Sequence, residues 1–577
     1  MKEEPLNNDE LQLFNRRDFI VKGILSVPLT AIIWRLWDLQ IKQGEKFKDL
    51  SKGNRVRINS VPAPRGLIYD RTGTIFSKNI PSFNLMLVRE DCEDVPTTLI
   101  KLAEVLKIPL KLLNANLKKF GKVQKFQSIQ LYKDLTWYQM ALVSAYQEEF
   151  SGINIEVSPR RFFPVTESGA HLMGYMSKIS KKQLQNLPQS KIMSARIIGQ
   201  DGVEGYYNSD LIGTDGGEQV EVNSRGRVIQ VMDSIEPTPG KDMVLNIDAK
   251  LQSKVEEILG DRKGSCILMN PNSGEVFCMA SKPSFNPNEF SQGLSAKRWK
   301  EMSNNPDHPL NNKGVQGVYS PGSTFKMAVA AAALELGIID SHTKHTCEGA
   351  YKYQNFTIHC WNRHGHGALN VTQALERSCN IFFYKLGMEI GVDRIKEYAN
   401  RMGLGLPTGV DLMHEKVGVM PSKAWKKKRF NQIWYVGETL PVSIGQGYVT
   451  STPLQLLTYI NCIATEGKKV QPRIVKQVLE KSSDLESVLR SPAADPVFEP
   501  VGFQQRTWDI LKEGMRKNVQ GAGGTGRSAR SYAVDIDMAG KTGTTQVVSH
   551  KTRTRLRAQN KMEERFFNHA WFVSFAP

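Results

Sequence analysis

A serine followed three residues later by a lysine is the first feature of this sequence that could do chemistry. The segment 323–336, STFKMAVAAAALEL, is rich in alanine and leucine and is followed by Gly337, which predicts a buried helix that ends there. Ser323 is then expected at the helix N-terminus and Lys326 on the same face one turn later. A serine hydroxyl needs an adjacent base, and a lysine serves only if burial or a nearby cation lowers its pKa. This spacing therefore predicts a nucleophilic serine with a lysine base.

Ser378 and Asn380 form a second group of polar side chains. They lie between an amphipathic stretch, VTQALER, and an apolar one, IFFYKLG, so we expect them on a loop between two helices. Ser378 is suited to relay a proton between Lys326 and a leaving group. The amide of Asn380 can hydrogen-bond a substrate amide.

A third group lies in the segment 541–548, KTGTTQVV, which is predicted to be a β-strand. Its lysine and two of its hydroxyls suit the terminal carboxylate of a substrate, and its glycine would let a substrate backbone approach closely. The same lysine is a cation that could lower the pKa of Lys326. The N–H groups of Ser323 and Thr544 are the expected oxyanion-hole pair. The candidate substrate-binding residues are therefore Asn380, Lys541, Thr542, Gly543 and Thr544.

The N-terminal segment predicts how the chain is held in place. With 577 residues the chain is long enough for two or three domains, and it opens with a polar stretch, 1–18, that ends in Arg16-Arg17. A largely apolar stretch, 19–41, follows it. These features predict a cytoplasmic tail at 1–18 and an uncleaved transmembrane signal anchor at 19–41, with the N-terminus inside by the positive-inside rule. A buried amphipathic helix and a twin-arginine export signal are the alternatives.

The rest of the chain is expected to divide near residue 240. From 42 to 240, strand-like and helical pieces alternate between glycine and proline punctuation, and the sequence there contains no candidate nucleophile, metal cluster or phosphate loop. From 241 to 577, a strand and a helix (249–259) precede a hairpin around the turn 271–274. This order predicts a non-catalytic module at 42–240 and an α+β domain at 241–577, in which helices flank an antiparallel sheet.

Seven cysteines raise the question of a metal site or disulfides. Cys347, Cys360, His366 and Cys379 follow the spacing C-x12-C-x5-H-x12-C and lead into the second polar group. Three thiolates and an imidazole are a complete tetrahedral zinc shell, so a structural zinc is predicted. A Cys347–Cys360 disulfide, unlinked thiols, and His364 as the fourth ligand are the alternatives. The other four cysteines are expected to be free thiols.

The three polar groups occur in the order Ser-x-x-Lys, Ser-x-Asn and Lys-Thr-Gly, which is typical of penicillin-binding proteins and class A β-lactamases. From about residue 16 to its end, the chain resembles class B penicillin-binding proteins, and among them penicillin-binding protein 2, the elongation-type transpeptidase. The longer segments that carry this resemblance are APRGLIYDRTG (63–73), RRFFPVTESGAHLMGY (160–175), GVEGYYNSDLIGTDGGEQVEVNSRGRVI (202–229), VLNIDAKLQ (244–252), GVYSPGSTFK (317–326), CWNRHGHG (360–367) and GETLPVSIGQGYVTSTPLQL (437–456).

The resemblance implies a serine β-lactamase-like transpeptidase domain on an elongated pedestal of the penicillin-binding protein dimerisation type. It implies a peptidoglycan D,D-transpeptidase that crosses the bacterial inner membrane once, with its catalytic domain in the periplasm, and that serves cell elongation and rod shape. Ser323 would attack the D-Ala-D-Ala bond of a stem peptide, or a β-lactam, and this chemistry would require no cofactor. A SEDS-type glycosyltransferase and the elongation complex are the implied partners.

The formal charge of +18 fits this interpretation. The basic residues are dispersed, and no nucleic-acid motif accompanies them. The charge therefore favours a protein that works beside anionic lipid and an acidic wall polymer over one that binds nucleic acid.

Two other functions stay open on the sequence. One is a β-lactamase or β-lactam sensor that uses the same three motifs, and the other is a non-catalytic scaffold for a partner glycosyltransferase. The C-terminal HAWFVSFAP is expected to be the second strand of a set that, in the family, continues with a third strand and a helix. The sequence thus predicts a chain truncated at its C-terminus, with unpaired backbone groups in the sheet, and this expectation favours the scaffold.

Overall fold

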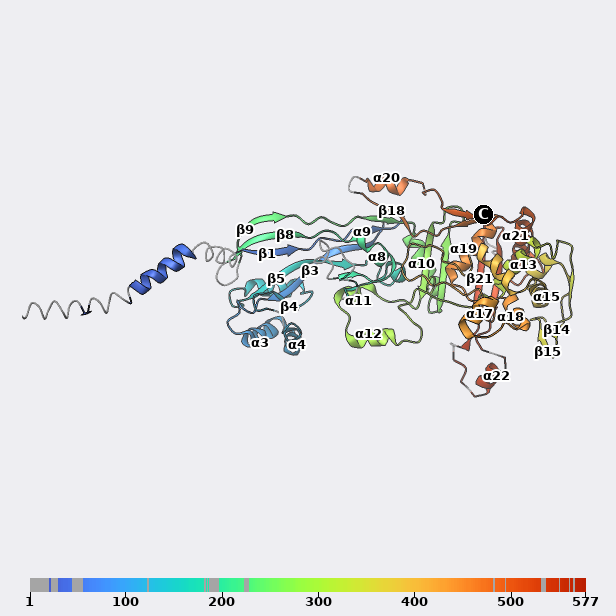
Figure 1. Ribbon diagram of the computed structural model, residues 1–577, viewed down its shortest axis with the longest axis horizontal. Helices are drawn as coiled ribbons and strands as arrows, with labels where there is room; N and C mark the ends of the chain where they lie inside the picture. The colour runs from blue at the N-terminus through green and yellow to red at the C-terminus, as the bar shows by residue number, and fades with distance from the viewer. Residues whose placement is uncertain are drawn as a thin grey trace, which may run out of the picture. The chain divides into compact units, whose positions relative to one another are not determined.

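The structure is a computed structural model that describes most of the chain (Figure 1). The described residues are 20–21, 28, 30–43, 56–121, 124–180, 183, 185, 197–222, 228–480, 483–492, 494–530, 536–548, 550–559, 561–563 and 566–577. The predicted tail, 1–18, lies outside them, and the predicted anchor, 19–41, is described only in part. Residues 30–37 are helical and continue into a π-helical turn, η1 (Asp38–Lys42). Within the described ranges, no helix combines the length and apolar character that crossing a bilayer requires.

The chain forms two compact units that alternate along the sequence. The first unit comprises Met1–Pro62, Ser82–Ser158 and Asp215–Thr238, and the second comprises Ala63–Pro81, Pro159–Thr214 and Pro239–Pro577. Two strands, β3 (Ile75–Leu87) and β5 (Ile153–Phe162), begin in one unit and end in the other. The predicted domain boundaries, 42–240 and 241–577, stay predictions.

The first unit holds a three-stranded antiparallel sheet and a helical cluster. The sheet pairs β1 (Val56–Val61) with β8 (Gly216–Val222), and β8 with β9 (Val228–Ile235). The helical cluster consists of α3 (Val95–Leu106), α4 (Leu110–Lys119) and α5 (Trp137–Ala145), with the short strand β4 (Ile129–Tyr132). Leucines at helical spacing on one face of α3 are buried in one cluster with residues of β3 and β4.

In the second unit, segments far apart in the sequence meet in one sheet. β10 (Met243–Leu245) pairs in parallel with β2 (Ile68–Tyr69) and antiparallel with β18 (Val475–Val478). All three side chains of β10 are fully buried. This pairing explains why residues 63–81 belong to the unit that contains the C-terminal half of the chain.

A buried ion cluster in the second unit joins three of the segments that carry the family resemblance. Glu204 is fully buried and accepts hydrogen bonds from Arg65 Nη2 at 2.8 Å and from Arg161 Nε at 2.5 Å. Burial raises the pKa of Glu204, but the charges of Arg161 and Arg65 outweigh it and hold the pKa below its usual range. The cluster therefore fastens segments of this unit to one another.

Helices form most of the core between residues 325 and 575. α13 (Lys326–Glu335) is buried along nearly its whole length, because its alanines let other helices approach closely. It packs against α15 (Asn380–Ile390), α16 (Val392–Arg401) and α21 (Gln505–Gln520); α13, α15 and α21 are labelled in the yellow to red part of Figure 1. The helix predicted over 323–336 is confirmed, except that its first turn, η4 (Gly322–Phe325), is a 3-10 helix.

Two of the strand pairs beside these helices contain strands that were predicted for the antiparallel sheet. β11 (Gly264–Met269) and β12 (Val276–Lys282) form the predicted hairpin, whose turn contains Gly274 at φ +77°. β20 (Ala539–Thr545) and β21 (His569–Phe575) form a second antiparallel pair. Among the strands that the structure describes, none hydrogen-bonds one pair to the other, so the predicted antiparallel sheet is present as two pairs. The mixture of helices and strands agrees with the predicted α+β class.

The other elements of the second unit are mostly short. α10 (Ala249–Leu259) has the predicted bounds and begins after Asp248, whose carboxylate accepts two backbone N–H groups of its first turn. The remaining elements are α6 (Ala170–Met173), β6 (Met176–Lys178), β7 (Ile197–Gly199), α8 (Gly202–Tyr206), α9 (Asn208–Leu211), α11 (Pro287–Gln292), α12 (Ala296–Ser303), β13 (His345–Cys347), β14 (Ala350–Tyr353), β15 (Phe356–His359), β16 (Gly367–Leu369), α14 (Val371–Glu376), α17 (Lys423–Phe430), η5 (Val436–Glu438), α18 (Thr439–Ser443), α19 (Pro453–Ala464), β17 (Lys468–Val470), α20 (Leu485–Arg490), β19 (Phe498–Pro500), η6 (Arg527–Ala529) and α22 (His550–Ala558).

Candidate active site

The turn that carries Ser323 is held by contacts that require a glycine before it. Ser323 lies in η4, directly before the helix of Lys326, and its side chain is half-buried. Gly322 has φ +58°, and its N–H donates to the Gly445 carbonyl at 2.8 Å. A Cβ atom at residue 322 would lie 2.7 Å from Thr545 Oγ1, so a larger residue would push the turn away from β20.

The amine of Lys326 brings the first two motifs together. Lys326 is fully buried, and its Nζ donates to the Ser378 carbonyl at 2.8 Å and to Asn380 Oδ1 at 2.7 Å. Ser378 Oγ lies 3.3 Å from the same nitrogen. Within the described residues, the Ser323 hydroxyl is not among the hydrogen-bond partners of this amine. The lysine therefore rests on the Ser-x-Asn loop and is one turn from the serine.

Two buried lysines lie near each other without a carboxylate partner. Lys326 and Lys541 are both fully buried, and in the described part of the chain neither forms an ion pair with a carboxylate. Burial lowers the pKa of Lys326 to about 8, although the nearby thiols of Cys379 and Cys360 oppose the shift. Burial, and then the charge of Lys326, lower the pKa of Lys541 well below its ordinary value. Burial is thus the main cause at Lys326, rather than the charge of Lys541 that the sequence suggested.

β20 places the third motif against the Ser323 turn. Thr545 Oγ1 donates to the Ser320 carbonyl at 2.8 Å, and Trp571 Nε1 on the paired strand donates to the same oxygen at 3.0 Å. A Cβ atom at Gly543 would lie 2.9 Å from the Pro321 carbonyl oxygen. Packing therefore explains the glycine at residue 543, because the absence of a side chain lets β20 pack closely on the Ser323 turn.

The other residues of the third motif differ in their surroundings. Thr542 Oγ1 hydrogen-bonds Thr525 Oγ1 at 2.6 Å, whereas Thr544 is exposed. Lys541 Nζ donates to the Thr542 carbonyl at 3.2 Å. The oxyanion hole expected from the N–H groups of Ser323 and Thr544 stays a prediction.

Ser378 lies on the predicted loop between two helices, α14 and α15. Its φ of +52° is unusual for a residue with a side chain and costs backbone energy, so other contacts must hold it. Trp361 supplies one of them, because its Nε1 donates to the carbonyls of Arg377 at 3.1 Å and of Ser378 at 3.2 Å. The Ser378 carbonyl therefore accepts from both Trp361 and Lys326.

Sequence reasoning did not single out Trp361. The signal that could have found it is its place directly after Cys360, in the segment CWNRHGHG that leads to the Ser-x-Asn loop. The Trp361 ring also lies 5.2 Å from the His366 ring, so it touches both the loop and the neighbouring sulfur cluster.

Three thiols and an imidazole meet beside this loop. The candidate ligand atoms of Cys347, Cys360, His366 and Cys379 all lie within 4.8 Å of one another. His366 Nδ1 lies 3.5 Å from Cys347 Sγ and 3.6 Å from Cys360 Sγ. The Cys379 thiol hydrogen-bonds Cys360 and, with His366 and two backbone N–H groups, holds the pKa of the Cys360 thiol below its usual value although burial raises it. Donors of this kind at this spacing fit a structural zinc site.

The remaining cysteines agree with the expectation of free thiols. All seven cysteines lie in the described ranges, and none is in a disulfide. Burial raises the pKa values of Cys278 and Cys462 to about 12, which makes these thiols unreactive. His364, the alternative fourth ligand, is not part of the group of donors that the described residues form.

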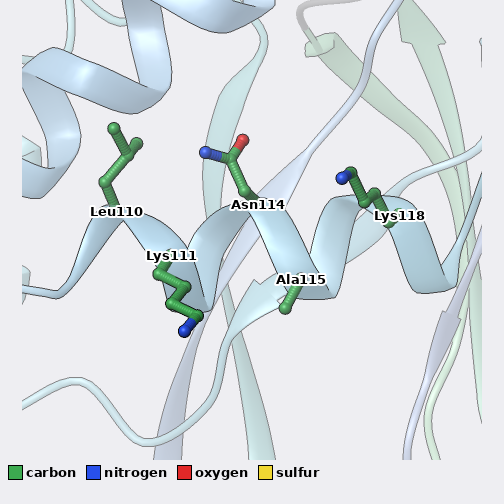
Figure 2. A pocket seen from close by; sticks show the side chains of 5 residues that line it. All are labelled: Leu110, Lys111, Asn114, Ala115 and Lys118. Carbon is green, nitrogen blue, oxygen red and sulfur yellow. The ribbon is translucent and has the colours of Figure 1, made fainter.

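Figure 2 shows a pocket on α4, in the first unit. It is lined by Leu110, Lys111, Asn114, Ala115 and Lys118, all from this one helix. None of these residues belongs to the three motifs or to the sulfur cluster. The candidate active site therefore rests on the contacts around Lys326 and not on this pocket.

Comparisons with known proteins agree with the site. The penicillin binding protein transpeptidase domain matches residues 264–577, and the penicillin-binding protein dimerisation domain matches residues 60–245. The peptidoglycan D,D-transpeptidase MrdA of Escherichia coli (strain K12) is 34% identical, over 98% of this chain and 90% of that protein.

Solved structures give the same result. The complex between penicillin-binding protein 2 and MreC from Helicobacter pylori matches with a TM-score of 0.75 and 26% identity, over 90% of this chain and 92% of that one. Penicillin-binding protein 2 of Pseudomonas aeruginosa in complex with WCK 5153 matches with a TM-score of 0.65 and 30% identity, over 90% and 89%. The chain therefore belongs to the penicillin-binding proteins with a transpeptidase domain, and among them to the penicillin-binding protein 2 group, which confirms the predicted family.

Proposed function

We propose that the chain is a peptidoglycan D,D-transpeptidase that cross-links stem peptides through an acyl-serine intermediate during cell elongation. The observation that carries this proposal is the buried Lys326 amine, whose pKa of about 8 suits a base one turn from Ser323. Family membership supports the substrate class, since the Escherichia coli relative is named as this enzyme.

The hydrogen bonds of Lys326 support its role as the base. A neutral amine has two N–H donors and one lone pair, and two oxygens that can only accept lie within 2.8 Å of it, the Ser378 carbonyl and Asn380 Oδ1. These two oxygens take both N–H groups. The lone pair is then left for a hydroxyl proton, from Ser323 or from Ser378.

In the proposed reaction the Ser323 hydroxyl gives its proton to Lys326 while its oxygen bonds to the carbonyl carbon of the D-Ala-D-Ala peptide bond. The C–N bond then breaks, and the terminal D-alanine leaves with a proton that Lys326 returns through Ser378. An amine of a neighbouring stem peptide attacks the ester, forms the cross-link and frees Ser323. A β-lactam opens its ring on the same serine and leaves a slowly hydrolysed ester. The residues proposed to hold the substrate are Asn380, Lys541, Thr542, Gly543 and Thr544.

Labelling with a fluorescent penicillin tests this proposal. The parent chain should be labelled stably, and Ser323→Ala should not be labelled, because the proposed ester forms on the Ser323 hydroxyl. Rapid steady-state hydrolysis of penicillin would support a β-lactamase instead. Absence of labelling in a folded parent chain would support a scaffold.

A structural zinc ion is also proposed, held by Cys347, Cys360, His366 and Cys379. When bound, zinc would supply a cross-link and no chemistry, because four protein donors leave no position for water. Cys360 Sγ already accepts the N–H of Asn380 at 3.4 Å, so the cluster is tied to the Ser-x-Asn loop. Metal analysis should find about one zinc per chain in the parent and in Cys266→Ser, and none in Cys347→Ser. If the parent chain under non-reducing conditions has no free thiol at Cys347 and Cys360, the Cys347–Cys360 disulfide is favoured instead.

Residues 19–41 are proposed to anchor the chain in the inner membrane, with a pedestal and the catalytic domain in the periplasm. Exposed apolar side chains on the described helical residues support this, since Ile33 and Trp34 leave 57% and 65% of their surface uncovered. Extraction of membranes at alkaline pH should leave the full chain in the pellet.

The proposed partners are those of an elongation complex, which the MreC complex of the Helicobacter pylori relative supports. A SEDS-type glycosyltransferase is the proposed polymerase.

A further inference from the structure

The part of the chain from α17 to η5 presents a basic and apolar surface that the proposed reaction does not use. The three basic residues 427–429 are exposed, and none of them forms an ion pair within the described ranges. Ile433 and Val436 follow and leave 68% and 58% of their surface exposed. Tyr435, between them, is 60% exposed. Residues 427–436 are called the basic-apolar segment below.

Buried contacts hold the basic-apolar segment in one arrangement. Lys426, which precedes it, is 1% exposed, and its Nζ lies 2.6 Å from both carboxylate oxygens of Glu438. Trp434 Nε1 donates to Thr439 Oγ1 at 3.0 Å. Anchors before and near the end of the segment therefore fix the backbone that carries the exposed side chains, which reduces the entropy cost of binding.

The basic-apolar segment is continuous with elements that build the candidate active site. Glu438 leads directly into α18, which packs against α15, the helix that begins at Asn380. Two residues after α18, the Gly445 carbonyl accepts the N–H of Gly322, the residue before the nucleophile. A polymer bound to the segment is thereby held by the same structural block as the catalytic serine.

We propose that the basic-apolar segment binds a carboxylate-bearing peptidoglycan strand outside the candidate active site; this inference rests on the proposed function. Un-cross-linked stem peptides carry free carboxylates, which match three adjacent unpaired cations. The exposed apolar and aromatic side chains match alanine methyl groups and the faces of sugar rings. Each exposed ionic contact is weak and screened by salt, but a repeating polymer engages several at once.

Binding of the full chain to soluble, un-cross-linked peptidoglycan strands tests the inference. Lys427→Glu/Lys428→Glu should weaken binding about tenfold at low salt, and added salt should reduce this difference. Lys297→Glu/Lys300→Glu makes the same change of charge on another exposed helix, α12, and should bind like the parent. Ile433→Ser removes only the apolar part and should weaken binding by a smaller factor.

Penicillin labelling of Ser323 separates this inference from the proposed function. The three variants and the parent chain should be labelled at the same rate, because none of the substituted residues is among the described contacts of Ser323, Lys326 or Ser378. Equal strand binding by the parent and Lys427→Glu/Lys428→Glu would overturn the inference. The inference would also be overturned if Lys427→Glu/Lys428→Glu kept strand binding but lost binding to anionic phospholipid vesicles or lost self-association. The segment would then face a membrane or a second copy of the chain.

Discussion

Two buried ionic groups in the second unit differ in whether an oppositely charged side chain is in direct contact with the buried charge. Around Glu204, two arginines pair with the carboxylate, and the pKa of that carboxyl is held low. Around Lys326, the nearest charged side chain of another motif is a second lysine, and burial lowers the pKa of both amines. Burial with a partner keeps a group ionised and makes it structural, whereas burial without one produces an amine that can accept a proton near neutral pH.

Replacing Lys326 with methionine tests whether the buried amine without an ion-pair partner is the base. The base is lost while the volume is kept, so acylation by a β-lactam should slow by about 10²–10⁴-fold. The free energy of unfolding should change by only about 1 kcal/mol, because the lost hydrogen bonds are offset by the removal of a buried amine. Lys385→Met, on α15, is the matched control and should acylate like the parent. Parental acylation by Lys326→Met would remove this lysine from the mechanism.

Replacing Glu204 with glutamine tests whether the paired buried carboxylate stabilises the fold. Two buried arginines would lose their counter-charge, so the free energy of unfolding in urea should fall by about 3–5 kcal/mol. The folded-state pKa of Glu204 is lowered, so its contribution is present above the ordinary carboxyl range and is lost as the pH falls through the folded-state pKa. Glu257→Gln, in an exposed ion pair, should cost about 0.5 kcal/mol or less. Equal costs for the two variants would contradict the distinction.

The pH dependence of acylation should sharpen the comparison. Lys326 must be neutral to act as a base, and its pKa is about 8, so the acylation rate should rise about tenfold per pH unit below that value and level off above it. Stopped-flow measurements between about pH 6 and 9.5 would show this profile. A folded Glu204→Gln chain should keep the same pH profile of acylation, since Glu204 contributes to stability and not to the reaction. A rate that is independent of pH over this range would argue against a lysine base.

The smallest expected effect concerns Trp361. Phenylalanine keeps the ring beside His366 but loses the N–H that donates to the Arg377 and Ser378 carbonyls. The loss of about 1 kcal/mol should slow acylation about fivefold, with the zinc content unchanged. Trp137→Phe, exposed in the first unit, is the control. An unchanged acylation rate in Trp361→Phe would show that the loop keeps its shape without this bond.

Local patterns predicted the elements that depend on neighbouring residues. The alanine-rich helix after Ser323, the helix α10, the hairpin around Gly274 and the loop at Ser378 all formed where the sequence indicated. Each of them depends on helix propensity, caps or turn residues within a few positions along the chain. The family, too, could be predicted from ordered motifs, and the comparisons confirmed it.

Contacts between distant segments could not be predicted in this way. The partners of Glu204, the role of Trp361 and the reason for Gly543 each join residues separated by many positions, and no local pattern encodes such a contact. The parallel pairing of β10 with β2 is of the same kind and determines which residues share a compact unit.

By itself, the sequence determined which chemical groups the chain possesses, their order, and the short elements that carry them. Only the tertiary structure decided which of those groups are ionised, because a pKa depends on how much water and which charges the folded chain leaves around each side chain. Buried charged residues therefore became a paired, structural cluster at Glu204 and an amine with a lowered pKa and no carboxylate partner at Lys326.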